Sequence, residues 1–210
     1  MKKAVQFLLG LVIIGLIYVV ATLIHTPLSF EKQLEERNAD VIVKLKDIRA
    51  AERAFKSKYQ HFTSDFDSLI NFILNDSLEL ERKLVDEDDS VAMAALKAKK
   101  IKNVEKFSMA VIDTIFSPKK LTEQDVRNFR FIPGTNSQAE FLMDAGVVTV
   151  GNVPVPVMVC KAPYKLFLDT VKYRQELINL VDECKNIYNK YPGIKVGDLD
   201  QPNNEAGNWE

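Results

Sequence analysis

The chain is organised by an uncharged apolar run, AVQFLLGLVIIGLIYVVATLI (residues 4–24), which leads almost directly into a charged segment, SFEKQLEERNADVIVKLKDIRAAERAFKSKY (residues 29–59). The apolar run contains 21 residues and no formal charge. A helix rises about 1.5 Å per residue, so this run reaches roughly 30 Å, which is the thickness of the hydrocarbon core of a bilayer. Residues 1–27 are therefore predicted to form a transmembrane anchor.

Two lysines, Lys2 and Lys3, precede this run and bear on both processing and topology. A cleavable signal peptide also begins with a basic region, but its apolar part is usually about 7–15 residues long and ends at a small-residue cleavage site. Here the apolar run continues to Ile24, so we expect it to be retained. Basic residues flank spans on the cytoplasmic side. The sequence therefore predicts a single-pass membrane protein, with a cytoplasmic N-terminus and nearly all of the chain on the extracytoplasmic side.

Residues 28–60 are predicted to form an amphipathic stem helix, because neither glycine nor proline interrupts them and apolar residues recur every seven positions. This stem stripe consists of Leu34, Val41, Ile48 and Phe55. Pro27 is expected to kink the helix or to restart it, with Ser29 as the N-cap of the second part. Asn38 and Glu52 interrupt the neighbouring column, so no long coiled coil is expected. The stripe either packs on the protein's own C-terminal domain or contacts other subunits, and the sequence leaves both interpretations open.

The composition of the chain limits its function. About 180 residues remain after the anchor, which is one domain of ordinary size. The 28 basic and 29 acidic residues are interspersed and give a net charge of −1. Nucleic-acid binding requires a concentrated basic surface, so we exclude DNA and RNA as partners.

Residues 61–210 are predicted to form an α+β domain, a small antiparallel sheet with flanking helices. Helical patterns, the first capped by Ser64, occur at residues 65–74, 91–102, 122–128 and 163–189. Strand patterns occur at residues 129–132, 139–142, 147–150 and 153–160, with turns or bulges at 144–146 and 151–152. The missing amides of Pro154 and Pro156 point the same way, which places residues 153–160 at a sheet edge or makes them an extended segment that crosses one. Residues 77–85 suit a strand or a helix equally.

The chemistry-bearing residues are few. Cys160 and Cys184 either form a disulfide, which would close a loop of about 25 residues and contribute roughly 3 kcal/mol, or remain two separate thiols. The sequence has no glycine-rich phosphate loop and no nucleophile elbow, and its two histidines, His25 and His61, are far apart. We therefore expect a protein that is not an enzyme and has no cofactor.

The C-terminal tail concentrates oxygen donors. Asp198, Asp200 and Glu205 have the chemistry of calcium ligands, although their spacing matches no defined calcium loop. The alternative, which we favour, is that Trp209 docks on the domain and pins the tail, because an indole can bury about 200 Å².

The order of a short cationic N-terminus, a spanning helix, an amphipathic extension and an antiparallel sheet resembles type IV pilins and type II secretion pseudopilins. The passage from Asp47 to Phe55, followed by Tyr59 and Leu69, is similar to the region that closes the long pilin helix. Pilins carry a glutamate five residues into the mature chain, where this sequence has Leu9, so the resemblance extends to the architecture and not to the processing motif. Pseudopilins hold calcium in a late loop, which the tail resembles. The residues Tyr191-Pro192-Gly193 and the terminal Gly207-Asn208-Trp209-Glu210 also resemble uncharacterised membrane-anchored proteins of Bacteroidota, which implies no function. Together these resemblances imply a bacterial inner membrane, with the C-terminal domain in the periplasm.

The leading functional prediction is a non-enzymatic, membrane-anchored structural or assembly protein, either a pilin-like subunit or a component of an envelope complex. Protein partners or further copies of the chain would then bind through the stem helix. The alternative prediction is a membrane-tethered binding module for a peptide, glycan or lipid, for which a lined pocket would be required.

Overall fold

The computed structural model describes residues 2–86, 88–98 and 102–210, and it has an α+β fold. Its elements, in chain order, are α1 (Lys2–Tyr59), α2 (Phe66–Asn75), β1 (Ser77–Lys83), α3 (Ser90–Ala98), β2 (Val104–Ala110), α4 (Val111–Phe116), α5 (Glu123–Arg127), η1 (Asn128–Arg130), β3 (Leu142–Val150), β4 (Val153–Pro163), α6 (Tyr164–Phe167), α7 (Arg174–Asp182), η2 (Glu183–Ile187) and β5 (Gly193–Gly197).

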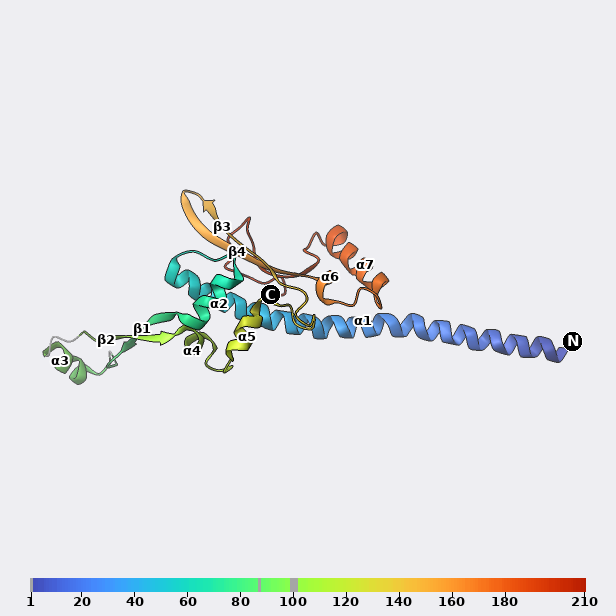
Figure 1. Cartoon of the computed structure of the whole chain (residues 1–210), viewed down its shortest axis with the longest axis horizontal. Helices are drawn as coiled ribbons and strands as arrows, with labels where there is room; N and C mark the ends of the chain where they lie inside the picture. The colour runs from blue at the N-terminus through green and yellow to red at the C-terminus, as the bar shows by residue number, and fades with distance from the viewer. Residues whose placement is uncertain (1, 87, 99–101) are drawn as a thin grey trace.

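Helix α1 is one continuous helix of 58 residues that includes both the apolar run and the stem (Figure 1). Pro27 lies inside it, so the expected restart at this residue does not occur. A proline removes only one amide donor, and the helix continues on both sides of the missing bond. Ser29 is not an N-cap: its hydroxyl donates to the carbonyl oxygens of His25 and, at 3.3 Å, of Thr26. The apolar run and the stem are therefore parts of one continuous helix.

The core is built around the second half of α1, which packs against β5, α2 and α4. The stem stripe faces this core: Val41 and Ile48 are fully buried, Phe55 is 8% exposed, and Leu34 is partly buried against the same cluster. The interpretation in which the stripe packs on the protein's own domain is the one that the structure adopts. The predicted burial of the α2 face, formed by Phe66, Leu69, Ile70 and Ile73, is confirmed.

The larger sheet is antiparallel and has the strand order β3-β4-β5. Strand β3 pairs with β4 from Leu142 opposite Lys161 to Val150 opposite Val153, so the predicted turn at 151–152 is confirmed. The predicted turn at 144–146 is wrong, because β3 continues through these residues and its pairing along all nine positions overrides the local turn propensity.

The predicted edge position of residues 153–160 is confirmed only in part, because β4 is the central strand in the order β3-β4-β5. Strand β5 pairs with β4 only from Val159 onward, so Pro154 and Pro156 lie in a stretch that pairs with β3 alone. At the end of the β4–β5 pair where Val159 lies opposite Gly197, this glycine has a φ of 75°, and a Cβ there would collide with the carbonyl oxygen of Met158. Close approach of the two backbones therefore requires glycine at this position.

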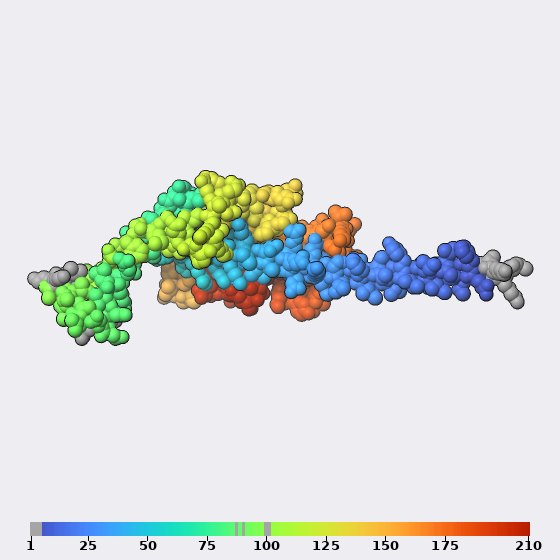
Figure 2. All heavy atoms as spheres, turned by 90° about the horizontal axis from the view of Figure 1, so that it is seen from below, coloured from blue at the N-terminus to red at the C-terminus, as the bar shows by residue number. Residues whose placement is uncertain are grey.

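The second sheet is the antiparallel pair β1–β2, which carries α3 and projects as an arm from the end of the domain opposite the N-terminus (Figures 1 and 2). Residues 77–83 are a strand, which resolves the ambiguity in the sequence. The helix expected at 91–102 is present as α3, and residues 99–101 lie outside the described part of the chain. Cross-strand ion pairs join Arg82 to Glu105 at 2.6 Å and Lys106 to Glu81 at 3.2 Å.

Three local predictions differ from the structure. The N-cap of α2 is Asp65 rather than Ser64, and its carboxylate accepts from the amide of Ser68 at 2.9 Å. The strand expected at 129–132 is the 3₁₀ helix η1 followed by a single bridge between Phe131 and Glu140. The helical region at 163–189 is divided into α6, α7 and the π-helical turn η2. The helix predicted at 122–128 is present as α5, with the reciprocal cap of Thr122 and Asp125.

Candidate functional site

The first half of α1 is the most unusual surface of the molecule. Its apolar side chains extend into open space from the end of the domain, and no residue of its most apolar 18-residue window is buried (Figure 2). Phe7, Ile14 and Leu23 are each more than 60% exposed. Within the described residues, α1 is the one helix long and apolar enough to cross a membrane. This surface is compatible with a membrane anchor.

The stem stripe is not a free surface, since the domain covers it. The sequence offered Leu34, Val41, Ile48 and Phe55 as an interaction face, and the structure uses these side chains to fill the core instead. The exposed apolar residues of α1 that lie close to or within the domain are Leu28 and Val43, at 63% and 54% exposure. Contacts of the stem with another protein would have to use this other face of the helix.

Glu52 is the most unusual polar residue of the core, because it is completely buried. One carboxylate oxygen accepts from the amide of Thr63 at 3.2 Å, while the other oxygen has no partner among the described residues. Burial disfavours the charged form and raises the pKa of Glu52 from 4.5 to about 8, against the smaller lowering effect of the Thr63 amide. At neutral pH this carboxyl group is largely protonated, so the core contains a neutral acid rather than a charge.

The two cysteines are free thiols in the structure, so the disulfide that the sequence left open is not formed. Cys160 is fully buried on β4, and desolvation raises the pKa of its thiol far above the usual value, with a further increase from the nearby Glu52 carboxyl. Cys184 lies in η2 and is partly exposed. Cys160 therefore contributes to packing rather than to reactivity.

The predicted calcium ligands do not form one site. Asp198 binds the ammonium group of Lys195 at 2.7 Å, which lowers the pKa of its carboxyl group, and Asp200 is exposed. Glu205 is 8% exposed and pairs with Arg53 at 2.9 Å and with Lys56 at 3.6 Å. No group of three metal-binding side chains occurs in the described ranges 2–86, 88–98 and 102–210. The carboxylate of Glu205 is thus paired with cations of α1, and that of Asp198 with a cation of β5.

The C-terminal tail is instead clamped onto α1. Trp209 packs against the core, Gly207 forms a bridge with Val196, and the amide of Asn208 donates to the carbonyl of Lys195 at 3.0 Å. Arg49 adds an ion pair with Glu210 at 2.6 Å. The favoured prediction, that Trp209 docks on the domain, is confirmed. The sequence analysis did not predict that Arg49, Arg53 and Lys56 of α1 bind the tail. Their partners, Glu205 and Glu210, lie about 150 to 160 positions away in the chain.

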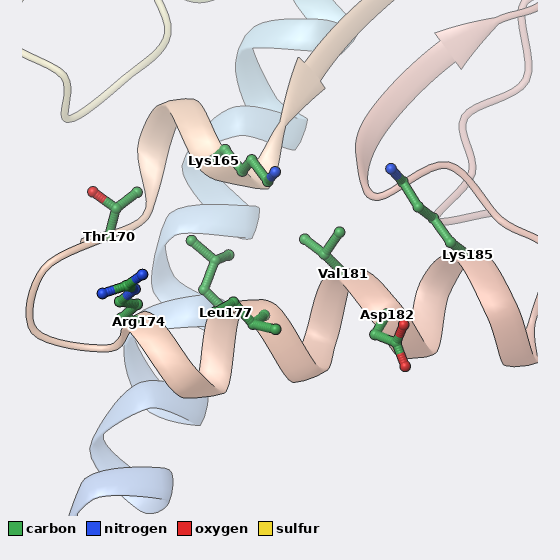
Figure 3. Close-up of a pocket in the computed structure, with 8 residues that line it drawn as sticks. Lys165, Thr170, Arg174, Leu177, Val181, Asp182 and Lys185 are labelled. Atoms are coloured by element: carbon green, nitrogen blue, oxygen red, sulfur yellow. The ribbon is translucent and has the colours of Figure 1, made fainter.

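A groove of about 450 Å³ lies between α6 and α7 (Figure 3). Leu177, Ile178 and Val181 form its apolar wall, and Lys165, Arg174 and Lys185 lie around it. The sequence analysis did not single out these residues. The spacing of positions 174, 177, 178 and 181 on α7 and of position 185 on η2 is typical of one helix face and is the signal that would have identified them.

No protein-family model matches the chain, and neither a curated protein nor a solved structure matches it at a significant level.

Proposed function

We propose that this protein is a non-enzymatic, membrane-anchored structural or assembly protein, a pilin-like subunit or a component of an envelope complex. The first half of α1 spans a bacterial inner membrane, with Lys2 and Lys3 in the cytoplasm and the α+β domain in the periplasm. The observation that supports this proposal most directly is the continuity of α1, in which an exposed apolar helix and the central helix of the core are one element.

This continuity has a mechanical consequence. A flexible linker would let a tethered domain sample many heights and orientations above the membrane. A helix without a break fixes the domain at one distance from the bilayer, and the tail clamp at Arg49 and Arg53 ties the last residues of the chain to the same helix. Such a rigid stem suits a part that must occupy a defined position in a larger assembly.

Because the stem stripe is buried, partners would bind exposed surfaces of the protein. In the membrane these surfaces are the exposed apolar side chains of α1, and above the membrane they are Leu28 and Val43. The projecting β1–β2 arm offers a further surface far from the anchor.

Anchorage and topology are tested with the full chain expressed in a bacterial host. We expect alkaline carbonate to leave the protein in the membrane pellet, and we expect an alkaline phosphatase reporter fused after Glu210 to be active, because this reporter folds only outside the cytoplasm. A soluble product that begins near residue 26, or an inactive reporter fused to a protein that is made at normal levels, would overturn the proposal.

Assembly is tested by crosslinking in intact membranes. In a Cys184→Ser background, single cysteines replace Leu11, Leu28 or Val43, and Val41→Cys is the matched buried control. We expect crosslinked species from at least one exposed position and none from Val41. Absence of any crosslink from all exposed positions would count against an assembly role.

The groove between α6 and α7 favours a second candidate function, the membrane-tethered binding module for a peptide, glycan or lipid. Its apolar wall and surrounding cations are features of small-ligand sites. A protein that crosslinks to no partner but retains a ligand through purification would favour this second candidate.

A further inference from the structure

We infer that the outer edge of β3 is a docking site for an extended strand of a partner polypeptide, which adds to the β3-β4-β5 sheet beside β3. The added strand pairs with the backbone of residues 143–149 and carries basic side chains near Asp144. This inference deepens the proposed assembly role, and the choice of a partner over a second copy of the chain rests on the proposed anchorage of α1.

The backbone groups of β3 that point away from β4 follow from two contacts. Val150 and Val153 flank a two-residue turn and lie opposite each other, which is the hydrogen-bonded pair that closes such a hairpin. Alternate residues of a strand direct their amide and carbonyl groups to opposite sides, so the odd-numbered residues of β3 direct theirs away from β4. The amide of Phe141 agrees with this assignment, because it donates to the carbonyl of Arg130 at 2.8 Å, outside the β3–β4 ladder.

The chain itself fills the first part of this outer edge. Residues 130–132 lie antiparallel to residues 139–141, and the amide of Ile132 donates to the carbonyl of Ala139 at 2.9 Å. Strand β3 then continues beyond this short pairing as far as Val150. The edge therefore accepts a neighbouring strand wherever the chain supplies one.

The rest of the outer edge has no neighbouring strand. Within the part of the chain that the structure describes, no backbone hydrogen bond reaches the outward groups of Met143, Ala145, Val147 and Thr149. The amide of Ala145 is bound by a side chain instead, since the Asp144 carboxylate accepts from it at 2.8 Å. A row of unpaired backbone groups is a template for another strand, because an extended polypeptide carries donors and acceptors at the same spacing. This row specifies a polypeptide as the ligand.

Strand β3 lacks the residues that usually protect a sheet edge. Natural edges carry lysine, proline or a bulge, and β3 contains none of these. The contrast lies within the same sheet, because the part of β4 that β5 leaves uncovered contains Pro154 and Pro156. Leu142, Val147 and Val150 of β3 instead expose apolar side chains, at 54%, 63% and 49%. Cross-strand contacts with an added strand would remove this surface from water.

A second copy of the chain does not fit this edge in one membrane. Two identical edges pair across a twofold axis perpendicular to the sheet, which makes the two strands antiparallel. Helix α1 runs along the sheet, and Ile48 of α1 shares one core cluster with Cys160 and Val196 of the sheet (Figure 1). The twofold axis would therefore reverse α1 and direct the second anchor away from the bilayer. The occupant is thus another polypeptide.

Charge complementarity narrows the choice of partner strand. Asp144 is the single charged residue of β3, and its carboxylate binds the Ala145 amide and, among the described residues, no cation. Glu140, an exposed acid just before β3, lies 3.9 Å from Arg130. A basic side chain on the added strand would pair with Asp144 without displacing a cation. An extended segment of alternating apolar and basic residues therefore matches this edge.

Binding is measured with the full chain purified in a neutral detergent, by the polarisation of a fluorescent peptide of alternating lysine and valine that has the length of β3, nine residues. The test variant is Val147→Pro, which removes one outward amide and leaves the ladder with β4 intact. The matched control is Val147→Ala, which loses the same side chain and keeps the amide. We expect Val147→Pro to bind about tenfold more weakly than Val147→Ala, since one net backbone hydrogen bond corresponds to roughly that factor.

Two further measurements locate the peptide and test its mode of binding. Exchange of backbone amide hydrogens should slow at residues 142–150 when the peptide is added. A peptide with the same lysines, but with its two central valines replaced by proline, should not bind although its charge is the same. Equal binding by the two variants, binding of the proline-containing peptide, or exchange that slows only outside residues 142–150 would overturn the inference. If Val147→Pro does not fold, Thr149→Pro and Thr149→Ala replace the pair.

Light scattering of the wild type tests the other occupant, because a dimer that Val147→Pro dissociates would assign the edge to a second copy and overturn the inference. Carbonate extraction separates the inference from the proposed function. Release of the wild type from the membrane, with slowed exchange at residues 142–150 in the presence of peptide, would show that the anchorage is wrong and the edge site right. Retention in the membrane without slowed exchange would show that only the edge site is wrong.

Discussion

The buried carboxyl group of Glu52 makes the stability of the fold depend on pH in an unusual direction. The unfolded chain exposes this group, which then titrates near 4.5, whereas in the folded protein its pKa is about 8. Between these values the folded state binds more protons than the unfolded state, so the free energy of unfolding falls as the pH rises. The stability from protonated Glu52 is complete below pH 4.5 and is lost progressively up to about pH 8.

The size of this effect follows from the shift. One pKa unit corresponds to 1.36 kcal/mol, so the interval from pH 5 to pH 8 corresponds to a loss of about 4 kcal/mol. Replacing Glu52 with glutamine removes the titration and keeps both the shape of the side chain and an acceptor for the Thr63 amide. We expect Glu52→Gln to gain stability relative to the wild type by about 4 kcal/mol between pH 5 and pH 8.

The measurement is urea unfolding of the full chain in a neutral detergent, followed by the fluorescence of Trp209, the single tryptophan of the protein. Glu35→Gln is the control, because Glu35 is an exposed carboxylate on the same helix. The titration of all other groups is common to the variants and cancels in the difference. The reasoning is refuted if the wild type and Glu52→Gln lose stability in parallel from pH 5 to pH 8.

Three further predictions concern the core, the tail and the thiols. Ile48→Asp should unfold the domain, because burying an unpaired charge costs several kcal/mol. Lys46→Glu on the exposed side should change the melting temperature little, and equal tolerance of the two substitutions would contradict the burial of the stem stripe. Deleting residues 207–210 should lower the melting temperature equally in calcium and in chelator, and a deletion without effect would mean that Trp209 does not stabilise the fold. A maleimide should label Cys184 in the native protein and label Cys160 only after denaturation, so rapid native labelling of a Cys184→Ser variant would show that Cys160 is not buried.

Local patterns predicted the elements that depend on neighbouring residues. The apolar run and the stem were each predicted to be helical, although their union in one helix across Pro27 was not, and the helix predicted at residues 122–128 is present as α5. The edge position predicted from Pro154 and Pro156 holds only before Val159, because β5 pairs with the rest of β4 and makes it the central strand. The predictions failed where long pairing overrode a local signal, as at residues 144–146 of β3.

The sequence by itself determined that the N-terminal region is helical, with an apolar first half and the apolar stem stripe along its second half. Only the tertiary structure decided what covers that stripe, because burial depends on which distant segments fold back against the helix. The same holds for Glu205, whose partners are cations about 150 residues earlier in the chain, and for Glu52, whose pKa is set by desolvation. It also holds for the groove, where Lys165 from α6 and Lys185 from η2 lie at one surface.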